Sequence, residues 1–222
     1  NAFSVTSKNT SNQKSRAFSM AKSAPLSRAS SNGKKVVVID PGHDSVHAGA
    51  ARYELREETL NFKIAMAAYN ELRTYHNVEV YLTRSSASCP VNGGSMSSCL
   101  LSRAQLARDK NADLFVSFHN NATGATTQTS SSGAFVYISN YSKYDKSSRL
   151  LTDYILSEFK TRIGLPVHGA WLNADDGNNG YYDDGRMQDD LSVIRNSVLY
   201  GVEPILIEHA YMNNPTDKAI LR

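Results

Sequence analysis

Apolar residues in this 222-residue chain form short continuous runs, and longer segments with a helical period lie between them. A short apolar run bounded by turn residues is typical of a strand that is buried on both faces of a sheet. The first run, residues 36–39, is ended by Asp40, Pro41 and Gly42. Five strands are predicted in this way, at residues 36–39, 78–82, 114–118, 135–138 and 205–207.

Three segments between these runs repeat their apolar residues with the period of an α-helix. They are residues 57–75, 100–110 and 146–162, and Gly164 and Pro166 mark the end of the third. Strands that alternate with helices predict an α/β fold. We therefore expect a single domain with an open, mostly parallel twisted sheet of about five to six strands and helices on both faces.

Two features near the ends of the chain refine this picture. Asn214 followed by Pro215 has the form of an N-cap and first helical residue, so a further helix is expected to begin there. No signal-peptide pattern follows Asn1, which favours a mature or trimmed fragment. The chain has no apolar run of about 18 or more residues, so no transmembrane helix is predicted.

The first 34 residues differ in composition from the remainder of the chain. They are rich in Ser and Asn, they contain basic but no acidic residues, and they show no sustained helical or strand period. We expect residues 1–34 to form a basic leader or linker and residues 35–222 to form the folded domain. Such a leader can attract an anionic polymer, or it can serve only as a solvated linker.

Residues 167–190 are rich in Asp, Gly and Asn and are predicted as a long polar loop. This composition is also found in calcium-binding loops. The spacing of the acidic residues does not match the helix-flanked calcium motif, and no acidic residue stands at its closing position. Calcium binding is therefore disfavoured.

The chain has two cysteines, Cys89 and Cys99, in a segment that also contains Pro90, Gly93 and Gly94. A flexible loop of this size can close as a disulfide, which fits an oxidising compartment. Two unrelated thiols are the alternative. A metal site at the cysteines is disfavoured, because no histidine is nearby in the sequence and the spacing is not that of a zinc motif.

Polar residues suited to metal chemistry follow three of the predicted strands. His43 comes after the first strand, His119 after the third and Glu208 after the last, while Glu57 opens the first long helix. Because the carboxyl ends of parallel strands lie at one edge of a sheet, these side chains are expected to converge there. Taken singly, either histidine can be a hydrogen-bonded turn residue, and Glu57 can simply favour a helix N-terminus.

Taken together, the two imidazoles and two carboxylates predict a metal hydrolase. Two histidines and one carboxylate form a common catalytic zinc shell that leaves a fourth position open. A second carboxylate beside that shell can take a proton from water and give it to a leaving amine. A serine hydrolase is disfavoured because the chain has no G-x-S-x-G motif.

Five ordered segments between about Lys35 and Leu221 carry a more specific pattern. The first is the strand and turn that end at His43, and the second is the helix start from Glu57 to Ala65. The third consists of Leu82-Thr83-Arg84 together with Leu100 to Arg103, and the fourth runs from Ala112 to Ala122. The fifth is Val193 to Arg195, followed by Pro204, Ile207 and Glu208. Together these segments resemble the zinc-dependent N-acetylmuramoyl-L-alanine amidases of bacteria.

The chain departs from the family's pattern at three places. Asp44 stands where Gly is usual, Arg108 stands where Asn is usual, and the closing Glu-x-Gly-Phe reads Glu-His-Ala-Tyr from Glu208. These departures concern the fit of substrate and remove no expected ligand. The segment from Cys89 to Cys99 looks like an insertion on the scaffold side or rim.

The resemblance implies that residues 35–222 are a catalytic domain that hydrolyses the amide between N-acetylmuramic acid and L-alanine in peptidoglycan. It implies that His43, Glu57 and His119 bind one zinc ion and that Glu208 is the catalytic general base and then acid. Asp40 is expected to hold the turn that presents His43.

Substrate contacts are expected from Arg195, His209 and Asn120. Arg195 has two interpretations, as a partner of a substrate carboxylate or of an acid beside the zinc ligands. His209 can orient a ligand or touch substrate, and packing or a surface position is an equally good interpretation.

The resemblance further implies a secreted monomer of the cell wall that acts on peptidoglycan, with no nucleic-acid partner. Anionic wall polymers are candidate partners of the basic leader. One rival is another zinc peptidoglycan amidohydrolase, a carboxypeptidase or a deacetylase, which can use the same shell. A non-catalytic wall-binding module is the other rival, and it is disfavoured because all four site residues are present.

Overall fold

A six-stranded sheet forms the centre of the molecule, which we describe from a computed structural model for residues 33–91, 94–124, 126–175 and 178–222. The strand order is β4-β1-β5-β8-β6-β7, and a separate pair, β2 and β3, forms a small hairpin. The strands are β1 Lys35–Pro41, β2 Ala51–Arg52, β3 Leu55–Arg56, β4 Val78–Leu82, β5 Leu114–Asn121, β6 Ala134–Ile138, β7 Val167–Leu172 and β8 Glu203–Tyr211.

Four neighbouring strands of the large sheet run parallel, so their carboxyl ends meet at one edge. Strand β1 pairs with β4 and β5, and β5 pairs with β8, all in parallel. Strands β6 and β7 are parallel to each other, but β6 is antiparallel to β8. The mostly parallel α/β sheet predicted from the sequence is thus confirmed, with an antiparallel junction between β8 and β6.

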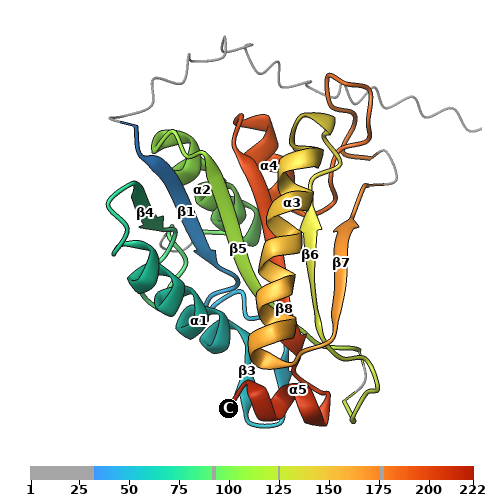
Figure 1. The fold of residues 1–222 in the computed structure, drawn as a ribbon. Helices are drawn as coiled ribbons and strands as arrows, with labels where there is room; N and C mark the ends of the chain where they lie inside the picture. Colours follow the sequence, from blue (N-terminus) through green and yellow to red (C-terminus); the bar gives the residue numbers. More distant parts are fainter. Residues whose placement is uncertain (1–32, 92–93, 125, 176–177) are drawn as a thin grey trace, which may run out of the picture.

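Helices cover both faces of the sheet, as Figure 1 shows. The helices are α1 Glu57–Leu72, α2 Met96–Asp109, α3 Ser142–Glu158, α4 Ser192–Leu199 and α5 Pro215–Ile220, and a π-helical turn η1, Phe159–Ile163, continues α3. Helices α1 and α3 lie on the near face in Figure 1 and α2 and α4 on the far face. Gly164 ends η1 with a left-handed φ of 77°, as a helix C-terminus favours.

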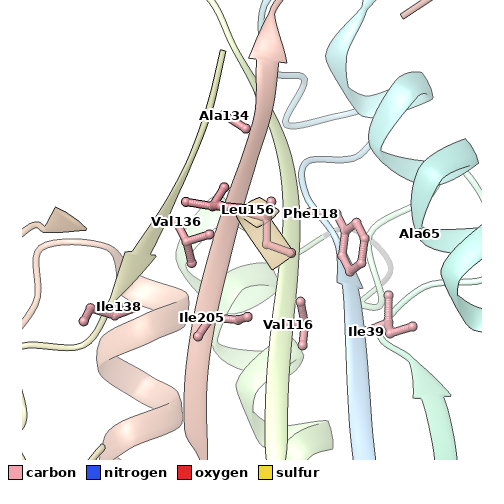
Figure 2. Packing of buried hydrophobic residues seen from close by; sticks show 10 residues of the cluster. Ile39, Ala65, Val116, Phe118, Ala134, Val136, Ile138, Leu156 and Ile205 are labelled. Carbon is pink, nitrogen blue, oxygen red and sulfur yellow. The ribbon is translucent and has the colours of Figure 1, made fainter. Parts of the chain in front are cut away.

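Apolar side chains fill the space between the sheet and each helical layer. On the α1 and α3 side, Ile39, Val116, Phe118 and Ile205 of the strands pack with Ala65 and Leu156 of the helices, as seen in Figure 2. On the α2 and α4 side, Phe115 and Leu206 pack with Ala107, Val193 and Ile194. Successive side chains of a strand therefore enter two different apolar cores, which explains why the sequence of the strand is a continuous apolar run.

Two expectations from the sequence need correction, and one helix was missed. Residues 167–190 are not a loop throughout, because β7 occupies Val167–Leu172 at the edge of the sheet. Helix α4 was not predicted. Glu208 is not at a strand terminus, since β8 continues to Tyr211.

The other predicted elements are confirmed, and β1, β4, β5, β6 and β8 match the five predicted strands. The helix expected at residue 214 is also present, with Asn214 as its N-cap: its side chain accepts hydrogen bonds from the backbone N–H groups of Thr216 and Asp217. Within the described ranges, no helix is both long and apolar enough to cross a membrane. The prediction of a separate leader falls almost entirely outside the described residues.

Candidate metal centre

His43, Glu57 and His119 converge at the carboxyl edge of the parallel strands. His43 follows β1 in a left-handed backbone conformation, with φ of 59°, and Glu57 is the first residue of α1. His119 lies near the end of β5. One potential ligand atom from each of the three residues lies within 4.8 Å of the others, so they can share a single ion. The convergence predicted from the sequence is present.

The carboxylate of Glu57 is the hub of this cluster. Its Oε1 atom lies 3.1 Å from His43 Nε2 and 3.1 Å from His119 Nδ1. The same oxygen accepts hydrogen bonds from Asn61 Nδ2 and the Asn120 backbone N–H, both at 3.3 Å. Burial opposes the charge of Glu57, but hydrogen bonds and charge from His119 and His43 outweigh it, so its pKa lies well below the usual range. This environment favours the carboxylate form of Glu57, which is the form in which a carboxyl group binds a metal.

Two glycines make room for these side chains: Gly42, expected from the sequence only as a turn residue, and Gly49, which the sequence did not point to. A Cβ atom on Gly42 would lie 2.2 Å from His119 Nε2, and one on Gly49 would lie 2.3 Å from Glu57 Oε2. Both distances are far inside van der Waals contact. Glycine is required here for the close approach of backbone to ligand, a requirement that only the folded chain reveals.

The turn that presents His43 is held by a buried ionic network. Arg103 Nη1 donates to Asp40 Oδ1 at 2.8 Å, and its Nη2 donates to the His43 carbonyl at 2.8 Å. Thr83 and Ser117 hydroxyls donate to the two oxygens of Asp40 at 2.5 and 2.7 Å. Burial opposes ionisation of Asp40, but these partners lower its pKa. The structural role expected for Asp40 is consistent with this network.

Glu208 lies beside the cluster in a very different environment. In the β5–β8 ladder it pairs with His119, and in the β6–β8 ladder with Phe135. Its Oε2 atom is buried and has no hydrogen-bond partner within the described part of the chain. Burial, and then the charge of Glu57, raise the pKa of Glu208 to about 8. A carboxyl group with such a pKa can exchange protons near neutral pH.

The three residues expected to touch substrate all have partners within the protein. Asn120 is 2% exposed and donates to Asn61 Oδ1 at 2.8 Å, which supports the hub carboxylate. The ring Nδ1–H of His209 donates a hydrogen bond to the His119 carbonyl oxygen at 2.7 Å, and the ring stacks on Phe118. Arg195 donates to the Asp189 and Asp190 carbonyls. Contact of these residues with substrate stays a prediction.

A cavity of about 200 Å³ opens beside the cluster. His43 and His119 line one side of it, and Leu191 and Ser192 at the start of α4 line another. A larger hollow of about 700 Å³ lies on the opposite face of the sheet, where only Lys63 and His209 interrupt an apolar lining. The smaller cavity is the better candidate for a reaction site, because it alone of these two borders the metal-binding cluster.

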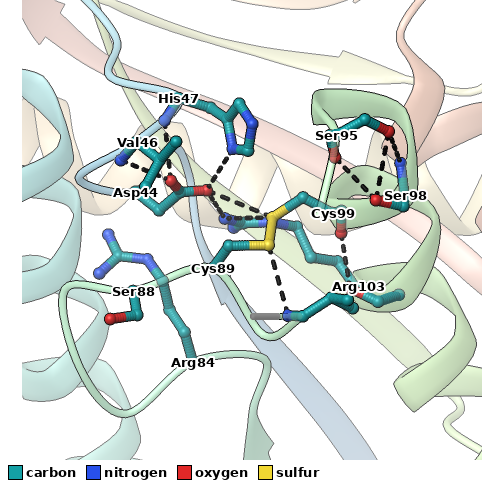
Figure 3. The surroundings of a disulfide bond; sticks show 12 residues. Asp44, Val46, His47, Arg84, Ser88, Cys89, Ser95, Ser98, Cys99 and Arg103 are labelled. Carbon is teal, nitrogen blue, oxygen red and sulfur yellow. Dashed lines mark hydrogen bonds and ion pairs between the residues drawn. A yellow bond between two sulfur atoms is a disulfide. The ribbon is translucent and has the colours of Figure 1, made fainter. Parts of the chain in front are cut away.

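Cys89 and Cys99 form a disulfide, and their Cα atoms are 6.0 Å apart. Cys99 is 2% exposed and lines the smaller cavity together with His43 and Asp44. The pair lies next to Asp44, as Figure 3 shows, and so at the rim of the smaller cavity, which is one of the two positions expected for this insertion.

Relatives of known name share both the sequence pattern and the fold. The family described as N-acetylmuramoyl-L-alanine amidase matches residues 37–222. An endolysin of Bacillus phage SPP1 is 29% identical over 190 residues, covering 85% of this chain and 59% of that protein. The N-acetylmuramoyl-L-alanine amidase AmiA of Escherichia coli is 32% identical over 124 residues, covering 55% of this chain and 39% of AmiA.

A solved structure gives the same assignment. The catalytic domain of CwlV, an N-acetylmuramoyl-L-alanine amidase from Bacillus (Paenibacillus) polymyxa var. colistinus, is 26% identical and superposes with a TM-score of 0.63, covering 84% of this chain and 86% of that one. The chain spans between 33% and 60% of the length of the curated relatives it matches. Because the family's sequence pattern matches 186 consecutive residues, 37–222, the chain belongs to the N-acetylmuramoyl-L-alanine amidase family.

Proposed function

We propose that this domain is a zinc-dependent N-acetylmuramoyl-L-alanine amidase that releases stem peptides from peptidoglycan. The observation that carries the proposal is the convergence of His43, Glu57 and His119 to within 4.8 Å. Glu208 lies on the strand next to His119, with one buried oxygen that has no partner among the described residues. Ligands and a proton carrier thus occur side by side.

The donor set fits zinc. Two imidazole nitrogens and one carboxylate oxygen form the usual protein shell of a catalytic zinc ion and leave a position for water or substrate. The backbone N–H of Ala50 donates to Glu57 Oε2 at 2.8 Å, so one carboxylate oxygen is fixed by the chain and the other faces both histidines. When bound, zinc would polarise the scissile carbonyl and stabilise the negative charge that develops on its oxygen.

The chain's own residues supply the proton chemistry. The carboxylate of Glu208 accepts a proton from the attacking water and then donates it to the amide nitrogen that leaves as the amino group of L-alanine. Its raised pKa, about 8, suits both steps near neutral pH. Asn61 and Asn120 hold Glu57 in place, and Arg103 holds the turn of His43.

The substrate sets the place of action. Peptidoglycan lies outside the cytoplasmic membrane, so we propose that the protein is secreted and acts in the cell wall. A disulfide between Cys89 and Cys99 is compatible with an oxidising location. Binding of anionic wall polymers by the basic residues before Lys35 remains part of the same proposal.

The test is to identify the new end group released from purified peptidoglycan. We expect free amino groups on L-alanine to be released only while zinc is present. A chelator should abolish this release, and added zinc should restore it. Release of D-alanine would indicate a carboxypeptidase, and release of acetate would indicate a deacetylase. Either product, or full activity after chelation, would overturn the proposal.

A further inference from the structure

A second group of metal-binding side chains surrounds the disulfide. Asp44, His47, Cys89 and Cys99 each offer one ligand atom, and all four atoms lie within 4.8 Å of one another. Asp44 and the two cysteines are buried, and the side chain of His47 is 17% exposed. Figure 3 shows the ring of His47 directed toward the carboxylate of Asp44, and that carboxylate next to the sulfur atom of Cys99. A metal site at the cysteines is disfavoured from the sequence alone, because His47 is 42 positions before Cys89 and only the fold brings them together.

The spacing of the donor atoms is close to that of a tetrahedral zinc site. Zinc bonds of about 2.0–2.3 Å place neighbouring nitrogen and oxygen ligands about 3.3 Å apart and sulfur and oxygen ligands about 3.5 Å apart. Here His47 Nδ1 lies 3.2 Å from Asp44 Oδ2, and Cys99 Sγ lies 3.2 Å from the same oxygen. Only the two bonded sulfur atoms are too close together, and breaking their bond lets each side chain rotate away.

The surrounding charges suit such an ion. Two thiolates and the carboxylate of Asp44 would carry three negative charges, one more than zinc neutralises. Arg103 Nη2 lies 3.3 Å from Asp44 Oδ2 and 3.8 Å from Cys99 Sγ, so its guanidinium faces the remaining negative charge. The other oxygen of Asp44 accepts hydrogen bonds from the backbone N–H groups of Val46 and His47, at 2.9 and 2.8 Å. Asp44 is thus oriented in the way that ligands of metal sites commonly are.

We propose that reduction of the Cys89–Cys99 disulfide creates a second zinc site, formed by Cys89, Cys99, His47 and Asp44. A dithiol reductant gives two electrons to the S–S bond and is itself oxidised to a disulfide, leaving two protein thiols. Binding of zinc then releases both thiol protons to solvent. The disulfide form and the zinc form are mutually exclusive, because the same two sulfur atoms are used in each.

This second site is independent of the proposed amidase activity, since it shares no ligand with the first. The two sites are nevertheless joined through one turn: Asp44 directly follows His43, and both line the cavity of about 200 Å³. Zinc bound at Asp44 would therefore fix the turn that carries a ligand of the first ion.

The experiment counts zinc per chain in the oxidised and reduced protein. Metal-free protein is reduced with a phosphine, which is then removed without air, and it is loaded with zinc and passed through a desalting column. We expect one zinc ion in the oxidised chain and two in the reduced chain. With cobalt in place of zinc, only the reduced chain should show the thiolate-to-cobalt charge-transfer absorption.

Variants separate the two sites. In His119→Ala, which removes a ligand of the first site, we expect no zinc in the oxidised chain and one zinc ion in the reduced chain. His47→Ala should lose only the second zinc of the reduced protein, whereas His76→Ala, a change at an exposed histidine, should keep both. The double variant Cys89→Ser with Cys99→Ser should hold one zinc ion under either condition.

A reduced wild-type chain that binds no more zinc than the oxidised chain, and whose cobalt form lacks the thiolate band, would overturn the proposal. Loss of the extra zinc in His76→Ala as well as in His47→Ala would also contradict it. Failure of the amidase assay would leave this count unaffected, so the two proposals fail separately.

Discussion

Glu57 and Glu208 are two carboxyl groups in the same site, the first buried and the second half-buried, and their surroundings shift the two pKa values in opposite directions. Around Glu57, backbone and side-chain N–H groups and two imidazoles approach both carboxylate oxygens. Glu208 lies on the strand between β5 and β6, and one of its oxygens is buried and meets no donor among the residues described. The pKa of Glu57 falls, whereas the pKa of Glu208 rises to about 8.

These two environments explain how one edge of a sheet can favour a charged carboxylate at Glu57 and a protonated carboxyl group at Glu208. Burial alone disfavours charge on both groups, so the number of donors decides which group ionises. The negative charge of Glu57 also raises the pKa of Glu208. The supply of hydrogen-bond donors, rather than residue type, therefore makes one carboxyl group suited to bind a metal and the other suited to transfer a proton.

The largest expected effect comes from exchanging each carboxylate for an amide. Glu57→Gln should abolish zinc binding, because the site loses its only anionic ligand. Glu208→Gln should keep its zinc and lose about two to four orders of magnitude in kcat, since an amide cannot carry the proton. Zinc analysis and initial rates on the same preparations measure both results.

Glu203→Gln is the matched control for this pair. Glu203 lies on the same strand, β8, and accepts a hydrogen bond from the Ser148 hydroxyl at 2.8 Å, far from the metal-binding cluster. Its variant should retain both zinc and activity. The assigned roles would be wrong if Glu208→Gln lost its zinc, or if Glu57→Gln retained it.

The strands and the expected metal ligands were predictable where a short stretch of sequence determines them. The run from Val36 to Ile39 is continuous because both of its faces are covered, and His43, His119 and Glu57 follow from where strands end and a helix begins. Strand β7 escaped prediction because it is an edge strand, interrupted by His168 and by Gly169 with φ of 81°. Its pattern has neither a continuous apolar run nor strict alternation.

The supporting parts of the site were not predictable, because they depend on distances between remote segments. Gly42 is needed only because the ring of His119 lies against it, and 77 positions separate them in the chain. Arg103 and Asp40 are 63 residues apart in sequence and meet at 2.8 Å. No window of sequence contains these pairs, so only the folded chain shows them.

A second prediction concerns His209, which follows Glu208 on β8 and points to the opposite face of the sheet. This histidine is buried, which lowers its pKa to about 4 from an ordinary value of 6.5. The unfolded chain therefore binds a proton between about pH 6.5 and 4 that the folded chain does not, and stability falls as the pH falls through this window. The loss amounts to up to about 3 kcal/mol.

Urea unfolding of zinc-free protein between pH 7 and pH 4 measures this loss. His209→Phe, which can fill the space between Phe118 and Phe159, should lose less stability than the wild type over the window. His76→Phe, at an exposed position, should follow the wild-type slope. Parallel curves for His209→Phe and the wild type would show that His209 is not held neutral by burial.

The smallest expected effect concerns the outer support of Glu57. Asn61 is fully buried, donates to Glu57 Oε1 and accepts a hydrogen bond from Asn120. Asn61→Ala should weaken zinc binding roughly 10- to 100-fold, as loss of a partner behind a ligand commonly does. At saturating zinc, kcat should change little. Asn70→Ala, on the exposed side of the same helix, should bind zinc as the wild type does, and an unchanged affinity in Asn61→Ala would exclude the supporting role.

The pairing of His119 with Glu208 across β5 and β8 has a consequence for engineering. Their relative position is set by the ladder of main-chain hydrogen bonds, which every sequence that keeps the sheet will reproduce. If the proposed function holds, loops around the cavity can be exchanged to accept other wall peptides while the spacing between His119 and Glu208 stays constant. Redesign of specificity should for that reason begin at the loops and leave these two strands untouched.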